Sequence, residues 1–343
     1  MLCGARIAVV IPAYRAADTV GPVIAGIPEV VDVIIVVDDG SPDATAEAAR
    51  ASGDPRVVCV RRERNGGVGA AMATGLAAAL ELHVDIIVKM DADGQMDASM
   101  LPDLLAPIIE HGFDYAKGNR FYDLSALRRM PFARRLGNVA LSFFNKVASG
   151  YWNVYDPQNG YTAIRRDVLE RLDLESLDPG YFFENSMLVQ LNIINARVAE
   201  VPIPALYGNE RSSMNLVKIC LVFPWKLHLA GLKRIRLKYF GMDFSPIAVL
   251  ITVGGVLFVG GAAYGIYEWV RHAIAGVPTP AGAVMLAALP VLLGAQLLLN
   301  ALLLDISQTP PGLGLRRIAT SNSNDRKRGS AGPSVARRGD PGR

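Results

Sequence analysis

Two long apolar stretches near the carboxyl end most constrain how this chain folds. Residues 246–267 and 283–304 each run for 22 positions without a charged side chain. At about 1.5 Å per residue, a helix of this length crosses the roughly 30 Å hydrocarbon core of a bilayer. A pair of buried core helices is the alternative, and it fits poorly with two stretches that are so long, so close together and uncharged. The sequence therefore predicts two transmembrane helices.

Charged residues around these stretches predict an orientation. Lys and Arg are frequent before the first stretch and after the second, whereas the titratable residues of the connecting segment 268–282 are Glu268, Arg271 and His272. Under the positive-inside rule both ends are then cytosolic. We expect an integral membrane protein with its soluble part on the cytosolic side, at the plasma membrane if the source is bacterial.

The segment before the first span is strongly basic. Residues 211–242 contain seven Lys and Arg and no acidic residue, interleaved with apolar side chains. Such a segment fits an amphipathic helix on an anionic membrane surface or a solvated helix of a soluble domain, and the neighbouring spans favour the membrane.

The distribution of charge excludes one class of partner. The formal net charge is +3, but residues 310–343 alone carry +6, which leaves the rest of the chain at −3. We therefore expect no nucleic acid partner. The tail is poor in apolar residues, which predicts disorder. The predicted organisation is a cytosolic domain (1–210), a basic juxtamembrane segment (211–243), two spans (244–306) and a disordered basic tail (307–343).

The first 118 residues alternate between two kinds of segment. Runs rich in Val and Ile occupy 7–11, 33–37, 57–60 and 85–88, and Ala-rich helical stretches lie near 17–27, 43–52 and 66–82. Short apolar strands that alternate with helices indicate an α/β fold whose parallel sheet is covered on both faces. In such sheets ligands bind beyond the carboxyl ends of the strands.

Polar groups follow these strands at that edge. Pro12 and Tyr14 end the first strand, Asp38-Asp39 ends the second, and Asp91-Ala92-Asp93-Gly94-Gln95 ends the fourth. Asp91 and Asp93 are two residues apart, so in extended backbone they lean the same way. A hard divalent cation needs only one or two protein carboxylates when a diphosphate fills other positions. A solvated Asp-Ala-Asp-Gly turn is the alternative.

Four motifs together resemble a known enzyme family. "IPAY", "VVDDGSPDAT", "RNGGVGAAMATGL" and "MDADGQM", in this order and spacing, resemble the inverting family 2 glycosyltransferases. The resemblance implies a GT-A (Rossmann-like) fold and a nucleotide-diphosphate sugar as donor. With two spans, the chain is similar to the polyprenyl-phosphate glycosyltransferases of the dolichol-phosphate mannose synthase type. That similarity implies transfer of a single hexose from a GDP-mannose or UDP-glucose type donor to a polyprenyl phosphate.

The resemblance also implies roles for individual residues. Pro12, Tyr14, Asp38 and Asp39 would line the nucleotide pocket, and Arg211 resembles a basic residue that clamps the donor diphosphate. Asp91 would face the nucleotide and the metal. The implied ligands of Mg²⁺ or Mn²⁺ are Asp91, Asp93 and Gln95. Arg15-Ala16 follows Tyr14 where related enzymes often read Asn-Glu, a departure in the nucleotide pocket.

Binding of the acceptor phosphate would depend on cationic side chains. A lipid monophosphate already carries an ionised oxygen, because its second pKa is about 6, so it needs positioning cations more than a general base. The candidates are Arg120 and the pair Arg134 and Arg135, with Asn138 one turn beyond Arg134; the resemblance favours Arg120 and Arg134. Glu184 is either a general base or a favourable charge at a helix N-terminus, and ranks below the metal site.

Three other interpretations remain at this point. A processive polysaccharide synthase would carry a Gln-x-x-Arg-Trp motif, but none of the three Trp residues follows an Arg. A catalytically inactive membrane scaffold fits poorly with the retained Asp91, Asp93 and Gln95. A membrane-tethered transferase for a soluble acceptor differs only in its acceptor. A homo-oligomer is compatible with each of them.

Overall fold

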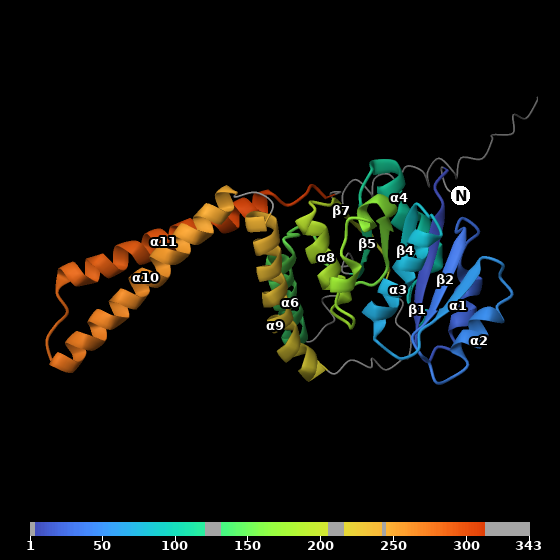
Figure 1. Cartoon of the computed structure of the whole chain (residues 1–343), viewed down its shortest axis with the longest axis horizontal. Helices are drawn as coiled ribbons and strands as arrows, with labels where there is room; N and C mark the ends of the chain where they lie inside the picture. Colours follow the sequence, from blue (N-terminus) through green and yellow to red (C-terminus); the bar gives the residue numbers. More distant parts are fainter. Residues whose placement is uncertain (1–3, 121–131, 205–215, 242–244, 313–343) are drawn as a thin grey trace, which may run out of the picture.

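The computed structural model describes residues 4–120, 132–204, 216–241 and 245–312, with the backbone alone for 132–140 and 216–221. Figure 1 shows an α/β domain, a pair of helices beside it, and a helical hairpin that extends away from both. The hairpin follows the second helix of the pair in the chain.

A sheet forms the centre of the domain. Within the described residues it has seven strands in the order β3-β2-β1-β4-β6-β5-β7. Strand β6 runs antiparallel to its neighbours β4 and β5, and the other pairs are parallel. The α/β class is confirmed, but the sheet is mixed because of β6. The strands are β1 (Ile7–Ala13), β2 (Val33–Asp38), β3 (Val57–Arg61), β4 (Ile86–Lys89), β5 (Tyr115–Asn119), β6 (Thr162–Arg165) and β7 (Val198–Pro202).

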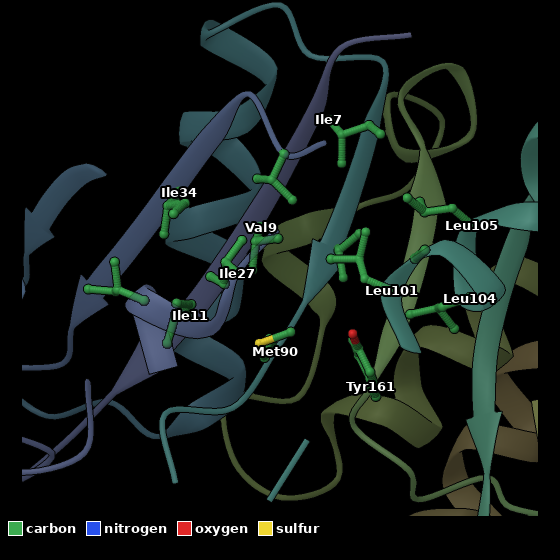
Figure 2. Close-up of a cluster of buried hydrophobic side chains, with 14 of the residues drawn as sticks. Ile7, Val9, Ile11, Ile27, Ile34, Met90, Leu101, Leu104, Leu105 and Tyr161 are labelled. Carbon is green, nitrogen blue, oxygen red and sulfur yellow. The ribbon is translucent and has the colours of Figure 1, made fainter. Parts of the chain in front are cut away.

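Helices cover both faces of this sheet. They are α1 (Val20–Gly26), α2 (Thr45–Arg50), α3 (Val68–Glu81), α4 (Leu101–His111), α7 (Arg166–Leu169) and α8 (Phe183–Ile193), with short 3₁₀ turns η1 (Ala98–Met100) and η3 (Leu174–Ser176). Residues of β1 alternate between two cores. Ile7, Val9 and Ile11 pack with α1 and α4, as Figure 2 shows in part, whereas Ala8 and Val10 pack with α3 and α8.

The parallel register brings the strand ends together. Ala13 of β1 pairs with Asp38 of β2, and Asp38 pairs with Arg61 of β3. On the other side of β1, Val10 pairs with Lys89, the last residue of β4. The motifs that follow β1, β2 and β4 therefore share one edge, as the sequence predicts.

Two helices lie between the domain and the hairpin (Figure 1). They are α6 (Phe132–Ser149) and α9 (Leu216–Ile235), and α9 continues into the π-helical turn η4 (Arg236–Gly241). Ala148 of α6 and Phe223 and Leu227 of α9 form a small core with Phe182. This core joins the helix pair to the end of the domain that carries α8.

The hairpin consists of α10 (Pro246–Ala275) and α11 (Ala281–Ser307). Among the described residues, these two helices are long and apolar enough to cross a membrane. Their backbones approach closely through glycine, as is typical of membrane helix pairs. A Cβ on Gly294 would lie 2.5 Å from the backbone nitrogen of Phe258, and one on Gly254 would lie 3.1 Å from the Gly294 carbonyl oxygen. Large apolar side chains such as Val256 and Leu292 point outward and are about two-thirds exposed.

Candidate active site

Asp38 is fully buried where β2 ends. Its Oδ1 accepts a hydrogen bond from the Ser41 backbone nitrogen at 2.9 Å, which shapes the turn after the strand. Its Oδ2 lies 3.3 Å from Nε of Arg61, yet among the described residues it accepts no hydrogen bond. A buried carboxylate oxygen without a donor is unusual in proteins, so Asp38 is suited to a ligand that brings a donor.

Asp39 holds the glycine-rich loop that begins α3. Its carboxylate accepts from the backbone nitrogens of Gly66 at 3.1 Å and Gly67 at 2.8 Å, and it pairs with Arg62. Gly67 has φ of +94°, and a Cβ there would lie 2.6 Å from the Pro179 carbonyl oxygen. Asp39 therefore fixes the shape of this loop with both of its oxygens.

Tyr14 and Arg15 flank the end of β1. The Tyr14 ring is 43% exposed and the Arg15 guanidinium lies 5.4 Å from its centroid. Arg15 has a left-handed backbone with φ of +53°, and its nitrogen donates to the Ser41 hydroxyl at 3.1 Å. Pro12 is buried within β1 itself. The unusual Arg15 therefore belongs to the same turn region as Asp38.

A buried lysine that the sequence analysis did not single out lies beside the Asp-Ala-Asp motif. Lys89 is 3% exposed, and its Nζ lies 2.6 Å from Oδ1 of Asp91 and 3.2 Å from Oε1 of Glu184. Burial by itself would lower the pKa of Lys89, but the two carboxylates outweigh it and raise that pKa. A Cβ on Gly160 would lie 2.4 Å from this Nζ. Lys89 is therefore a fixed positive charge in a space with no room for a larger group.

The Asp-Ala-Asp-Gly-Gln motif presents exposed side-chain oxygens. The Asp91 side chain is 31% exposed, and Asp93 and Gln95 are exposed. The Gln95 backbone nitrogen donates to Oδ1 of Asp93 at 3.0 Å, which fixes the turn. Within the described residues no group of three or more His, Cys, Asp and Glu could hold a metal. The residues present therefore fit a Mg²⁺ or Mn²⁺ ion shared with a diphosphate, and do not fit a site made by protein side chains alone.

Arg120 belongs to a polar network after β5. Its Nε and Nη2 donate to the two oxygens of buried Asp156 at 2.8 and 3.0 Å, while its side chain stays 41% exposed. Buried Glu200 accepts from the Asp156 nitrogen at 2.8 Å and from Nδ2 of Asn119 at 2.9 Å. Arg120 is thus held in place by a bidentate pair, the geometry that orients a guanidinium best.

The interior of this network contains a second buried lysine. Lys117 is 1% exposed and its Nζ donates to the Asn159 carbonyl oxygen at 3.2 Å. Burial lowers the pKa of Lys117 to about 8, although Asp156 and Glu200 oppose the shift. Burial likewise raises the pKa of Glu200. Residues 156–160 therefore connect Arg120 to the Lys89 region through a buried polar layer.

The structure brings together only some of the predicted residues. Pro12, Tyr14, Asp38, Asp91 and Glu184 lie at or beside the carboxyl edge. Arg134, Arg135 and Asn138 occupy the first turns of α6, where only the backbone is described, and Arg211 lies outside the described residues. The sequence analysis did not identify Lys89, Lys117, Asp156, Gly160 and Glu200; a charge at the end of an apolar strand was the one available signal for Lys89.

Comparison with known proteins agrees with this geometry. Residues 8–173 match the family described as glycosyl transferase family 2. The chain is 33% identical over 205 residues to an undecaprenyl-phosphate mannosyltransferase of Micrococcus luteus, covering 58% of this chain and 82% of that protein. It is 34% identical over 206 residues to a polyprenol monophosphomannose synthase of Mycolicibacterium smegmatis, covering 58% and 76%.

A third relative and a solved structure extend the comparison. The chain is 32% identical over 190 residues to a UDP-N-acetylglucosamine–dolichyl-phosphate N-acetylglucosaminyltransferase of Methanococcus voltae, covering 51% and 75%. Glucosyl-3-phosphoglycerate synthase from Mycobacterium tuberculosis, solved with Mn²⁺, UDP-glucose and phosphoglyceric acid, is similar with a TM-score of 0.51 and 26% identity, covering 67% of this chain and 80% of that one. The expected GT-A fold is confirmed, and this chain belongs to glycosyltransferase family 2.

Proposed function

We propose that the protein transfers one hexose from a nucleotide-diphosphate sugar to a polyprenyl phosphate at the cytosolic face of a membrane. The observation that carries the proposal is the joining of a family 2 domain to an apolar helical hairpin in one chain. The relatives named above take their names from undecaprenyl, polyprenol and dolichyl phosphates. Such an acceptor is found in a membrane, and the hairpin would keep the domain there.

The donor nucleotide would bind beyond β1 and β2. The unbonded Oδ2 of Asp38 supports this, because an N–H of a base or a ribose hydroxyl would supply the missing donor. The exposed ring of Tyr14 offers a flat apolar face to a base. Asp39 would act through the loop of Gly66 and Gly67 that it holds. Arg211 as a diphosphate clamp stays a prediction.

Asp91, Asp93 and Gln95 would hold Mg²⁺ or Mn²⁺ together with the donor diphosphate. When bound, the ion would neutralise charge on the leaving diphosphate. Lys89 holds Asp91 by one oxygen, which orients the other. We expect Asp93→Ala to lose transfer at every metal concentration while its thermal unfolding stays unchanged. Mn²⁺ binding to the protein with a nucleoside diphosphate, followed by electron paramagnetic resonance, gives a second readout; normal activity in the variant contradicts the metal assignment.

The acceptor phosphate would be its own nucleophile. Its ionised oxygen forms a bond to the sugar carbon as the bond from that carbon to the diphosphate breaks, and attack from the opposite face inverts the configuration. No proton has to be removed, so Glu184 is assigned to holding Lys89, at 3.2 Å. Arg120, Arg134, Arg135 and Asn138 are the candidates for binding the acceptor phosphate.

The helix α9 would lie on the membrane surface. Its side chains Trp225, Leu229 and Leu232 are each about half exposed or more, although they are large and apolar. An exposed apolar face beside basic residues fits the interface between headgroups and acyl chains. In this arrangement the domain (1–210) and the juxtamembrane segment (211–243) would lie on one side of the membrane, and the positive-inside rule predicts that this side is the cytosolic one.

Acceptor class is the decisive test. The full-length protein in liposomes is given a labelled nucleotide-sugar panel with Mn²⁺ and one of three acceptors: a polyprenyl phosphate, a free sugar or phosphoglyceric acid. The last acceptor matters because a structural neighbour was solved with it. We expect label that extracts into organic solvent and is released by mild acid. Label found only on water-soluble products would refute the lipid acceptor.

A further inference from the structure

The carboxyl-terminal ends of helices meet at one point beside the membrane hairpin. Within the described residues, three helices (α6, α8 and α11) place their last turns there, at Ala148, Asn192 and Asp305, beside Arg234 of α9, which continues into η4. The carboxyl end of a helix carries a partial negative charge and unpaired carbonyl groups. Three such ends would repel one another unless a cation lies among them.

Arg234 of α9 is the cation at the centre, and Lys238 of η4 adds a second one, whose Nζ donates to Oδ1 of Asn192 at 2.9 Å. Arg234 is 1% exposed, and among the described residues its guanidinium donates five hydrogen bonds. Two go to Oδ1 and Oδ2 of Asp305 at 2.7 and 2.9 Å. The others go to the carbonyl oxygens of Ala148 at 3.0 Å and Val147 at 3.2 Å, and to Oδ1 of Asn192 at 3.3 Å. One side chain therefore contacts α6, α8 and α11 at once.

Asp305 has no evident reason to be at its position other than this contact. It directly follows the uncharged stretch 283–304 and lies two residues before the end of α11, where the helix dipole disfavours an anion. Ionisable residues in or next to a span are costly unless paired. Asp305 is only 8% exposed, and it also accepts a hydrogen bond from the Tyr239 hydroxyl of η4.

The surrounding chain is shaped to fit the guanidinium. Gly150, just after α6, has φ of +74°, and a Cβ there would lie 2.5 Å from Nη1 of Arg234. After α11 the chain returns to the same loop: the Thr309 hydroxyl donates to the Gly150 carbonyl at 3.3 Å, and Nδ2 of Asn153 donates to the Pro310 carbonyl at 3.2 Å. The hairpin is thus attached to the domain at the end of α11 as well as through α9.

We infer that Arg234 and Asp305 are positioning residues that set the acceptor-binding end of α6 relative to the membrane. The inference rests on the proposed function, because the first turns of α6 carry Arg134, Arg135 and Asn138, the predicted acceptor-phosphate residues. The last turn of α6 contacts Arg234. Residue 134 lies about 21 Å from residue 148 along the helix. We call the Arg234–Asp305 pair and its helix partners the joint. A tilt of about 5° between α6 and the hairpin at this joint would move residue 134 by about 2 Å relative to the hairpin. Misplacement by about 1 Å can cost a hundredfold in rate.

The test compares two acceptors on the full-length protein in liposomes. A long-chain polyprenyl phosphate is held at a fixed depth in the bilayer, whereas a short-chain prenyl phosphate reaches the site from water. Arg234→Lys keeps the charge but lacks the fork that binds both oxygens of Asp305. We expect its kcat/KM for the long-chain acceptor to fall at least about tenfold, with the short-chain value and nucleoside diphosphate affinity within about twofold of wild type.

Matched variants isolate the joint. Arg166→Lys makes the same chemical change in the ion pair of Arg166 with Glu170, which lies on the catalytic domain, and should leave the ratio of the two acceptors unchanged. Tyr239→Phe removes one hydrogen bond to Asp305 and should change the ratio in the same direction by less. An equal loss with both acceptors, a loss of nucleotide affinity, or no change in Arg234→Lys would overturn the inference.

A distance measurement separates this inference from the proposed function. Spin labels at positions 144 on α6 and 259 on α10, both exposed, report the angle between the helix and the hairpin. Arg234→Lys should broaden the measured distance distribution, and Arg166→Lys should not. If the wild-type protein uses neither lipid phosphate, the proposed function is refuted. The distances between the labels then test by themselves whether Arg234 fixes the angle between α6 and the hairpin. A distance distribution that is not broadened in Arg234→Lys refutes that role of Arg234.

Discussion

The active-site edge and the membrane joint each contain a buried cation paired with carboxylates, but the two are built differently. Lys89 contacts Asp91 and Glu184 with a single ammonium group, and Asp91 is 31% exposed. Arg234 makes five hydrogen bonds among the described residues, and Asp305 is 9% exposed at its side chain. Lysine is a point charge on a flexible stem, and arginine is a rigid fork. The first arrangement suits a site whose partners change when substrate binds, and the second suits a permanent joint.

The largest effect on activity should come from the lysine. Lys89→Met leaves Asp91 and Glu184 without their cation, so the oxygen of Asp91 offered to the metal is no longer oriented. We expect transfer to fall about a hundredfold or more, as when a positioned charge or donor is removed from an active site. The measurement is kcat with saturating donor and Mn²⁺.

Two further variants sharpen this expectation. Lys89→Arg should not restore activity, because a Cβ on Gly160 would already lie 2.4 Å from the Lys89 Nζ and the larger fork has no space. Glu184→Gln should lose less than Lys89→Met, since Asp91 would still hold the lysine. Full activity in Lys89→Arg would show that charge alone matters there.

The largest effect on stability should come from the arginine. Arg234→Met leaves Asp305 buried without its cation, and breaking one partner of a buried pair typically costs about 3–5 kcal/mol. Replacing both, as Arg234→Met with Asp305→Leu, should restore most of the free energy of unfolding. Lys89→Met should cost less than Arg234→Met, because water reaches the exposed part of Asp91. Chemical unfolding in detergent micelles measures the free energy of unfolding of all three variants. Equal losses in Lys89→Met and Arg234→Met would contradict the difference between the two buried cations.

The smallest effect on stability should come from Lys117, which lies in the polar network of Asp156 and Glu200. Burial lowers its pKa to about 8, whereas in the unfolded chain it stays near 10.5. Between these values the unfolded chain binds more protons, so this group makes stability rise with pH, by at most about 1.4 kcal/mol per pH unit. Below pH 8 Lys117 is protonated in both states and no longer makes the free energy of unfolding depend on pH. Unfolding from pH 7.5 to 9.5 should show a steeper rise in wild type than in Lys117→Met; parallel curves would refute the shift.

The two regions also differ in how far the sequence predicted them. Strands β1, β2 and β4 are predictable because their runs of Val and Ile are buried on both faces, and the partly exposed edge strand β3 is predictable from its run of Val alone. The motifs after β1, β2 and β4 fall on one edge because parallel strands end together. Strand β6 was not expected, because "TAIR" is short and pairs antiparallel with partners far away in sequence. Its reversal makes the sheet mixed.

Within the site, single residues were easier to predict than their contacts. Asp38 and Asp91 follow apolar strands, which marks them directly. Lys89 was not singled out, because its meaning depends on Glu184, 95 positions later. Asp39 as part of the nucleotide pocket stays a prediction, and its contacts with Gly66 and Gly67 could not be predicted because they require knowing the loop geometry. The Arg234–Asp305 pair spans 71 residues and joins a basic segment to the end of a long apolar helix, so no local pattern identifies it.

The position of Asp305 in the chain has a consequence for biosynthesis. The ribosome makes Arg234 well before Asp305, and all of α10 and most of α11 lie between them. The cation therefore stays without its carboxylate until the second apolar helix, α11, has been synthesised. Closure of this pair consequently has to wait for the second helix of the hairpin, so a chain interrupted inside α11 would keep a guanidinium without its carboxylate beside the hairpin.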